Sequence, residues 1–225
     1  MAAILVLAGC GCRRAVSADA DAVDRAFLLI DPGHGGEDGG TVAEDGTLEK
    51  DINLAVGQDL RDYFTLWGIP VEMTRDDDVS IHDPGNRTAR QKKVSDMVNR
   101  LERYQRASLV IAVHQNHFSV PKYAGAQVFY SVNHPDSRLL ADAVQRVIRA
   151  DLQPTNHREI KPATDSIYLL HRTDRPAILV ECGFLSNPDE RERLKTPEWQ
   201  SKVACAICCG YWNYTMTEEA KEYGF

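Results

Sequence analysis

Four residues of this chain, His34, Glu49, His114 and Glu181, have side chains suited to metal-assisted hydrolysis. Two imidazoles and one carboxylate form a known catalytic zinc set, in which a fourth position stays open for water. A second glutamate outside that set would transfer the proton. The contiguous HExxH motif of helix-borne zinc sites is absent, so such a site would have to be assembled from separate segments of the chain.

Each of these residues also has an ordinary structural interpretation. His34 lies on the glycine-rich turn 31–36, and Glu49 opens a helix whose dipole favours a carboxylate. His114 and Glu181 end strongly apolar strands. A buried histidine without a partner costs roughly 1–3 kcal/mol, so His114 must be hydrogen-bonded or ligated. Burial raises a carboxyl pKa, which suits Glu181 to general base catalysis near neutral pH. The residues alone leave a zinc hydrolase as one interpretation among several.

The elements that would position these residues alternate between strands and helices. This order predicts a single α/β domain with a mostly parallel sheet covered by helices on both faces. Ligand sites in such sheets lie beyond the carboxyl ends of the strands, where three of the four candidates fall. Strands are expected at 27–31, 69–74, 109–114, 126–131, 167–170 and 178–181, and helices at 48–67, 86–104, 135–152 and 197–214.

Composition excludes several classes of protein. The chain has 225 residues, with 26 Lys and Arg against 33 Asp and Glu, for a net charge of −7. This mildly acidic balance argues against a nucleic-acid-binding protein. The turn at 31–36 lacks the spacing of phosphate-binding loops. The six cysteines show no paired spacing of a zinc ribbon, so they do not predict a cysteine metal site.

The amino-terminal residues resemble an export or anchoring signal. Residues 2–9 form an apolar run that is far shorter than the ~18–20 residues needed to span a bilayer. Residues 7–10, Leu-Ala-Gly-Cys, resemble a bacterial lipobox in which Cys10 would carry the lipid. The alternative is a chance match in a tail of small residues. Residues 13–24 are small and charged and are typical of a linker.

Four segments carry a resemblance to a known family: LLIDPGHGGEDGG, TLEKDINLAVG, VIAVHQNHF and AILVECGFLSN. In order and spacing the chain resembles the zinc-dependent N-acetylmuramoyl-L-alanine amidases of bacterial cell-wall turnover. The resemblance implies a six-stranded α/β fold and hydrolysis of the amide between muramic acid and L-alanine in peptidoglycan. It further implies that His34, Glu49 and His114 bind Zn²⁺, that Glu181 is catalytic, and that Asn116 lines the substrate site. His117 departs from the family pattern and is not counted as a ligand.

A longer match, from GAQVFYS to the last helix, is similar to the germination-specific amidases of spore formers. It implies a role in cortex maturation for muramic-δ-lactam formation, outside the cytoplasm in the cell envelope or forespore intermembrane space. An accessory envelope lipoprotein is an expected partner, and nucleic acid is not. The alternatives are a wall amidase of growth or division, or a zinc carboxypeptidase. The expected organisation is a leader or anchor with linker at 1–24, the amidase domain at 25–216 and a tail at 217–225.

Overall fold

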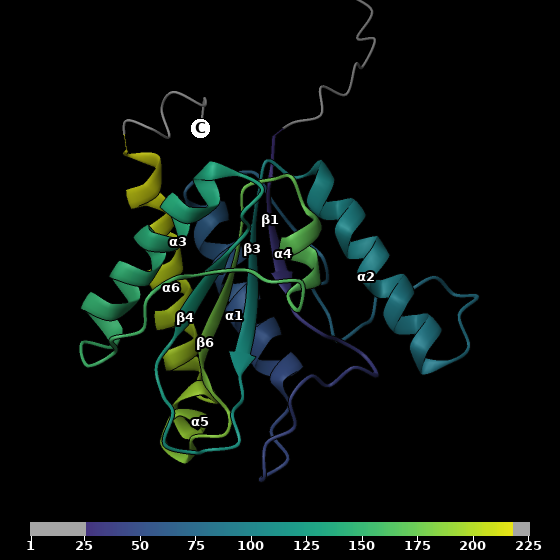
Figure 1. Ribbon diagram of the computed structural model, residues 1–225, viewed down its shortest axis with the longest axis horizontal. Coiled ribbons are helices and arrows are strands. Elements are labelled where there is room, and N and C mark those ends of the chain that lie inside the picture. The colour runs from purple at the N-terminus through teal and green to yellow at the C-terminus, as the bar shows by residue number, and fades with distance from the viewer. Residues whose placement is uncertain (1–25, 218–225) are drawn as a thin grey trace, which may run out of the picture.

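A six-stranded sheet organises residues 26–217, which are the part of the chain that the computed structural model describes (Figure 1). The strand order is β2-β1-β3-β6-β4-β5. All neighbouring pairs are parallel except β4 and β6, which run antiparallel. The mostly parallel sheet predicted from the sequence is therefore confirmed. The strands are β1 (Leu28–Pro32), β2 (Val71–Met73), β3 (Leu109–Asn116), β4 (Gln127–Tyr130), β5 (Lys161–Pro162) and β6 (Ala177–Phe184).

Helices cover both faces of this sheet (Figure 1). Side chains alternate between the faces of a strand. Leu28 and Ile30 therefore pack with the helices α1, α3 and α6, whereas Leu29 packs with α2 and α4. Two apolar layers result, one on each side of the sheet. The helical elements are α1 (Glu49–Leu66), α2 (Ala89–Arg106), α3 (Pro135–Val147), the π-helical turn η1 (Ile148–Leu152), α4 (Tyr168–Arg172), α5 (Pro188–Leu194) and α6 (Pro197–Thr215).

Local sequence signals fix where several helices begin. Thr88 and Gln91 form a capping box at the start of α2, in which each side chain bonds the backbone of the other. The helices α3, α5 and α6 each begin with a proline, whose missing N–H is not needed there. In α5 and α6 the preceding residues, Asn187 and Thr196, accept a backbone N–H with their side chains. These caps agree with the helix starts expected near 135 and 197.

One expected strand is wrong. Residues 167–170 were predicted as a strand, but Tyr168–Arg172 form the short helix α4, and the last sheet position is filled by Lys161–Pro162. A short apolar run cannot distinguish a buried strand from a buried helix. Here Leu169 and Leu170 are both buried in the layer under α2, an arrangement that one helical turn allows.

The expected leader at 1–24, with its lipobox at Cys10, lies outside the described residues. Most of the expected tail at 217–225 also lies outside them. Within residues 26–217, no helix combines the length and the apolar character that crossing a bilayer requires.

Candidate active site

The first candidate ligand lies on the loop that leaves β1. His34 has a φ of 63°, a left-handed backbone conformation that is uncommon outside glycine. The preceding Gly33 donates its N–H to the carbonyl of Val113 on β3 at 3.0 Å. A Cβ atom at Gly33 would lie 2.2 Å from the His114 ring, so only glycine lets the loop approach this strand. The glycine thus brings two candidate ligands, His34 and His114, together.

Two buried arginines hold the backbone of this loop. Arg100 on α2 donates to the carbonyl oxygen of Pro32 at 3.1 Å and to that of His34 at 2.7 Å. Arg75, which follows β2, donates to the carbonyls of Pro32 and Gly33, each at 3.0 Å. The planar guanidinium offers several donors in a fixed geometry, which suits it to binding successive carbonyls. The loop conformation is therefore set by two elements outside the loop.

Asp31 balances the charge of Arg100 below the loop. The two side chains form an ion pair in which both partners are buried. Asp31 also accepts hydrogen bonds from Tyr104 Oη at 2.5 Å and from Thr74 Oγ1 at 2.6 Å. Burial raises the pKa of Asp31, but Arg100 and these hydrogen bonds outweigh it, and the net pKa is lowered. The carboxylate stays charged and anchors Arg100.

His34, Glu49 and His114 converge at the carboxyl edge of the sheet. Glu49 Oε1 lies 3.4 Å from His34 Nε2 and 3.0 Å from His114 Nδ1. One ligand atom from each residue falls within 4.8 Å of the others, a spacing that a single metal ion can span. The two imidazoles contact edge to face, with ring centroids 5.1 Å apart. The donor set matches the two-histidine, one-glutamate sets of catalytic zinc sites.

Surrounding hydrogen bonds orient the three side chains. The second ring nitrogen of His34, Nδ1, lies 3.1 Å from Asp38 Oδ1, the carboxylate–histidine pairing that fixes a metal-binding tautomer. Glu49 accepts the backbone N–H of Thr41 at 2.8 Å and that of Gln115 at 3.1 Å. The ligand atoms are therefore held in place by the fold itself.

These contacts shift the pKa values of His34 and Glu49. Burial works against the charged imidazole of His34, but hydrogen bonds with Asp38 and Glu49 outweigh it and raise its pKa to about 9. Burial would likewise raise the pKa of Glu49, yet the two histidines lower it far below its usual value. Two imidazoles thus share one fixed negative charge. A bound cation would take the place of the proton on these rings.

Glu181 lies beside the triad without belonging to it. It stands opposite His114 in the pairing of β3 with β6. Its Oε2 atom is enclosed and has no hydrogen-bond partner among the described residues. Burial, the largest effect, raises the pKa of Glu181 to about 7, with Glu49 adding to the rise and His114 opposing it. A carboxyl group with this pKa can exchange a proton near neutral pH.

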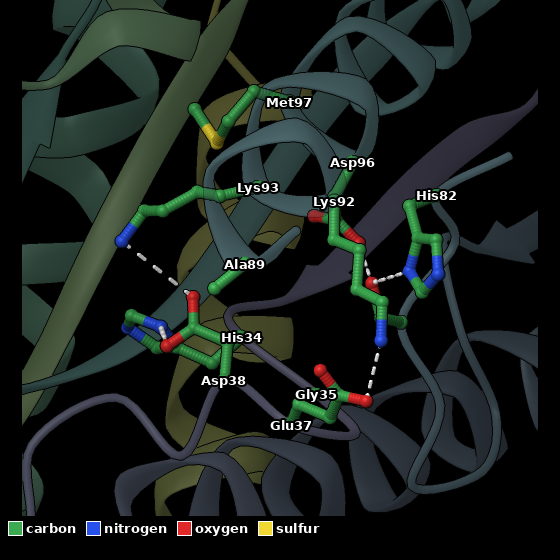
Figure 2. A pocket seen from close by; sticks show the side chains of 11 residues that line it. His34, Gly35, Glu37, Asp38, His82, Ala89, Lys92, Lys93, Asp96 and Met97 are labelled. Atoms are coloured by element: carbon green, nitrogen blue, oxygen red, sulfur yellow. Dashed lines mark hydrogen bonds and ion pairs between the residues drawn. The ribbon is translucent and has the colours of Figure 1, made fainter. Parts of the chain in front are cut away.

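The site opens into two adjoining cavities. One, of about 310 Å³, is bounded by His114, Glu181 and the segment 166–170. The other, of about 230 Å³, lies between the 34–38 loop and α2 (Figure 2). Figure 2 shows Lys93 and Lys92 reaching from α2 toward Asp38 and Glu37 respectively. Together the two cavities extend from Glu181 along α2.

The remaining predicted residues fall beyond the triad. Asn116 ends β3 after an irregularity in the strand pairing, and it lines neither of these cavities. Its backbone carbonyl accepts the N–H of Leu185. The contact of Asn116 with substrate stays a prediction. His117 is exposed and lies outside the group of three candidate metal ligands.

Sequence reasoning did not find the residues that support the site. They lie next to the candidate ligands in space, and most of them are far from those ligands in the chain. Asp31 and Asp38 had a local signal, because they stand three residues before and four residues after His34 in one glycine-rich segment. The missed residues are Asp31, Asp38, Arg75, Lys93, Arg100 and Tyr104.

Comparison with known proteins agrees with this geometry. The chain is 35% identical over 190 residues to the germination-specific N-acetylmuramoyl-L-alanine amidase of Bacillus subtilis, covering 84% of this chain and 79% of that protein. It is 27% identical over 232 residues to the amidase AmiA of Escherichia coli, covering 84% and 76%. The CwlD amidase of Clostridioides difficile, solved in complex with the GerS lipoprotein, superposes with a TM-score of 0.81 at 40% identity, covering 84% of this chain and 98% of that one.

The family model for N-acetylmuramoyl-L-alanine amidases, Amidase_3, matches residues 28–211, a range that holds all four candidate residues. The match spans every strand of the sheet, from β1 to β6. The alternative of a carboxypeptidase has no support in these comparisons. The chain belongs to the Amidase_3 family and is an N-acetylmuramoyl-L-alanine amidase that acts on peptidoglycan.

Proposed function

We propose that this amidase works with one Zn²⁺ ion held by His34, Glu49 and His114, with Glu181 as the catalytic residue. The observation that carries the proposal is the convergence of both imidazoles on Glu49 Oε1, within 3.4 Å, beside the enclosed Oε2 atom of Glu181, which has no partner in the described part of the chain. When bound, zinc polarises the scissile carbonyl and lowers the pKa of water.

The protein side of the reaction is assigned to residues with different surroundings. Glu181 takes the proton from the attacking water and passes it to the leaving nitrogen of L-alanine. Asp38 keeps His34 oriented through its 3.1 Å contact with Nδ1. Asn116 contacts the glycan-peptide chain near the end of β3. The working unit is the domain 25–216, preceded by a leader and linker at 1–24 and followed by a tail at 217–225.

The biological setting we propose is maturation of the spore cortex, where removal of stem peptides prepares muramic acid for δ-lactam formation. Similarity to the germination-specific amidase of Bacillus subtilis supports this setting. The enzyme would then act outside the cytoplasm, in the cell envelope, with a membrane anchor before the domain. Its similarity to an amidase solved with a lipoprotein supports an accessory envelope lipoprotein as partner.

Metal analysis and muropeptide analysis together test the chemical proposal. Purified protein should contain about one zinc per chain, and a chelator should abolish the release of intact stem peptides from peptidoglycan. Glu181→Gln should retain zinc and lose the release of peptides. Full activity of the metal-free protein, or wild-type activity of zinc-loaded Glu181→Gln, would contradict the assignment.

A separate experiment tests the biological setting. Deleting the gene in its own organism should remove muramic-δ-lactam from the spore cortex, as seen in muropeptide profiles. Unchanged δ-lactam, together with altered vegetative wall, would instead support the alternative of a growth or division amidase.

A further inference from the structure

The two cavities of the site share a short stretch of wall. His34, Asp38, Lys93, Asp96 and Met97 line both of them. A peptide that leaves the reacting centre at Glu181 and enters the cavity along α2 must therefore pass the Lys93 side chain. Figure 2 shows this amine directed toward Asp38 and His34, whereas Lys92 points toward Glu37 on the far side of the cavity.

The cations that line these cavities differ in how firmly they are paired. Lys92 Nζ donates to Glu37 at 2.6 Å. Arg100 is buried and bound to Asp31 and Asp96. Lys93 Nζ lies 3.7 Å from Asp38 Oδ2, beyond hydrogen-bond distance, and 67% of its side chain is exposed. Within residues 26–217, Lys93 is the lysine that lines both cavities, and its amine makes no hydrogen bond there.

Asp38 forms only a long ion pair with Lys93, with 3.7 Å between Oδ2 and Nζ. Its Oδ1 atom lies against His34 Nδ1 at 3.1 Å and also accepts the N–H of Gly40 at 3.1 Å. The Asp38 carboxylate is thus shared between His34 and Lys93. The Lys93 amine faces the cavity without a hydrogen bond to any of the described residues.

We propose that Lys93 determines specificity by binding the free α-carboxylate of the residue that follows L-alanine in the stem peptide. The Lys93 amine lies 3.7 Å from Asp38, and Asp38 lies 3.1 Å from His34. An extended residue spans about 3.3–3.6 Å, so the amine lies about one to two residue lengths from the proposed metal ligand His34. In stem peptides that following residue is D-glutamate, whose α-carboxylate is either free or amidated. The inference rests on the amidase function and names the part of the substrate that Lys93 binds.

Paired substrates test the proposal directly. Soluble muramoyl peptides that carry either D-glutamate or its α-amide are compared by kcat/KM with the zinc-loaded full chain. Wild type should favour the free acid by about three- to fivefold, the effect of one exposed ion pair. Lys93→Met should reduce this ratio to about one by slowing cleavage of the acid substrate alone. Lys93→Arg should preserve the ratio, and the matched control Lys92→Met should leave it at its wild-type value.

Inhibition by the dipeptide product gives a second measurement. L-alanyl-D-glutamate should inhibit wild type more strongly than its amide does, and Lys93→Met should remove the difference. A wild type without preference, or a Lys93→Met variant that keeps the full ratio, would overturn the proposal while leaving the amidase function intact. Failure to cleave either substrate would instead contradict the amidase function, and the proposal for Lys93, which rests on that function, would fail with it.

Discussion

Replacing Arg100 with methionine should reduce the free energy of unfolding by about 3–5 kcal/mol, because it leaves a buried carboxylate without its cation. Arg100 is 2% exposed, and its partner Asp31 is 1% exposed. Methionine preserves much of the side-chain volume but donates no hydrogen bond. Asp31 keeps Tyr104 and Thr74 as donors, which sets the loss below that of a wholly unpaired charge.

The pH dependence of this loss follows from the pKa of Asp31. Its pKa in the folded protein is lowered, so its charge stabilises the fold above the unfolded pKa of ~3.9 and ceases to do so as the pH falls through the folded value. Without Arg100 the pKa of Asp31 rises. The difference between Arg100→Met and wild type should therefore be largest near pH 7 and should shrink as the pH falls toward about 4 and below it.

Urea unfolding followed by circular dichroism measures the stability, and competition with a chromophoric chelator measures zinc affinity. Arg100→Met should also weaken zinc binding, because the carbonyl of His34 loses its 2.7 Å hydrogen bond and the left-handed backbone at that residue loses its support. Arg100→Lys keeps the charge near Asp31 but not the forked contacts to two carbonyls. It should recover stability more fully than zinc affinity.

A loss below about 1 kcal/mol at pH 7 would refute the reasoning, since it would mean that the buried pair contributes no more than a surface pair. Unaltered zinc affinity in both variants would separately refute the role of Arg100 in holding the loop. The two measurements are independent, so the energetic and the positioning arguments can fail one at a time.

Three further predictions follow from the site. Asp38→Asn should weaken zinc binding by about 10- to 100-fold in chelator competition, because His34 loses a charged partner, whereas unchanged affinity would exclude that role. The kcat/KM of wild type should fall on the acid side of about pH 7, where Glu181 becomes protonated. A bound cation should move the midpoint of this fall to a lower pH. A kcat/KM that stays constant at acid pH would exclude Glu181 as base. Gly40→Ala should reduce both stability and zinc affinity, because a Cβ there would lie 2.7 Å from Glu49 Oε2 at a φ of 66°, and wild-type values for both would count against this packing.

The sequence predicted the fold and the candidate ligands because both depend on local patterns. Apolar runs marked most of the strands. His34 follows the end of β1, whereas His114 and Glu181 lie opposite each other near the carboxyl ends of β3 and β6. Parallel strands bring their carboxyl ends to one edge. The convergence of His34, His114 and Glu181 is therefore a consequence of topology, and Glu49 joins them because α1 begins at the same edge.

The supporting residues could not be predicted because their roles depend on distant contacts. Arg75 and Arg100 belong to polar segments that resemble any solvated surface, yet both are buried against the loop after β1. Nothing in their local spacing signals this burial. The helix at 168–172 could not be predicted for a similar reason. Its short apolar run fits a strand or a helix, and tertiary packing decides between the two.

The two glutamates of the site show how surroundings give one residue type two roles. Glu49 accepts two backbone N–H groups and contacts two imidazoles, and its pKa is lowered far below the usual value. The Oε2 atom of Glu181 is enclosed and has no hydrogen-bond partner within residues 26–217, and the pKa of Glu181 rises to about 7. A permanently charged carboxylate can bind a cation but is a poor proton acceptor, whereas one poised near neutrality can accept and release a proton. The proposed assignment of Glu49 as ligand and Glu181 as base agrees with their hydrogen bonding and burial, because exchanging the roles would require each side chain to act against its own electrostatic environment.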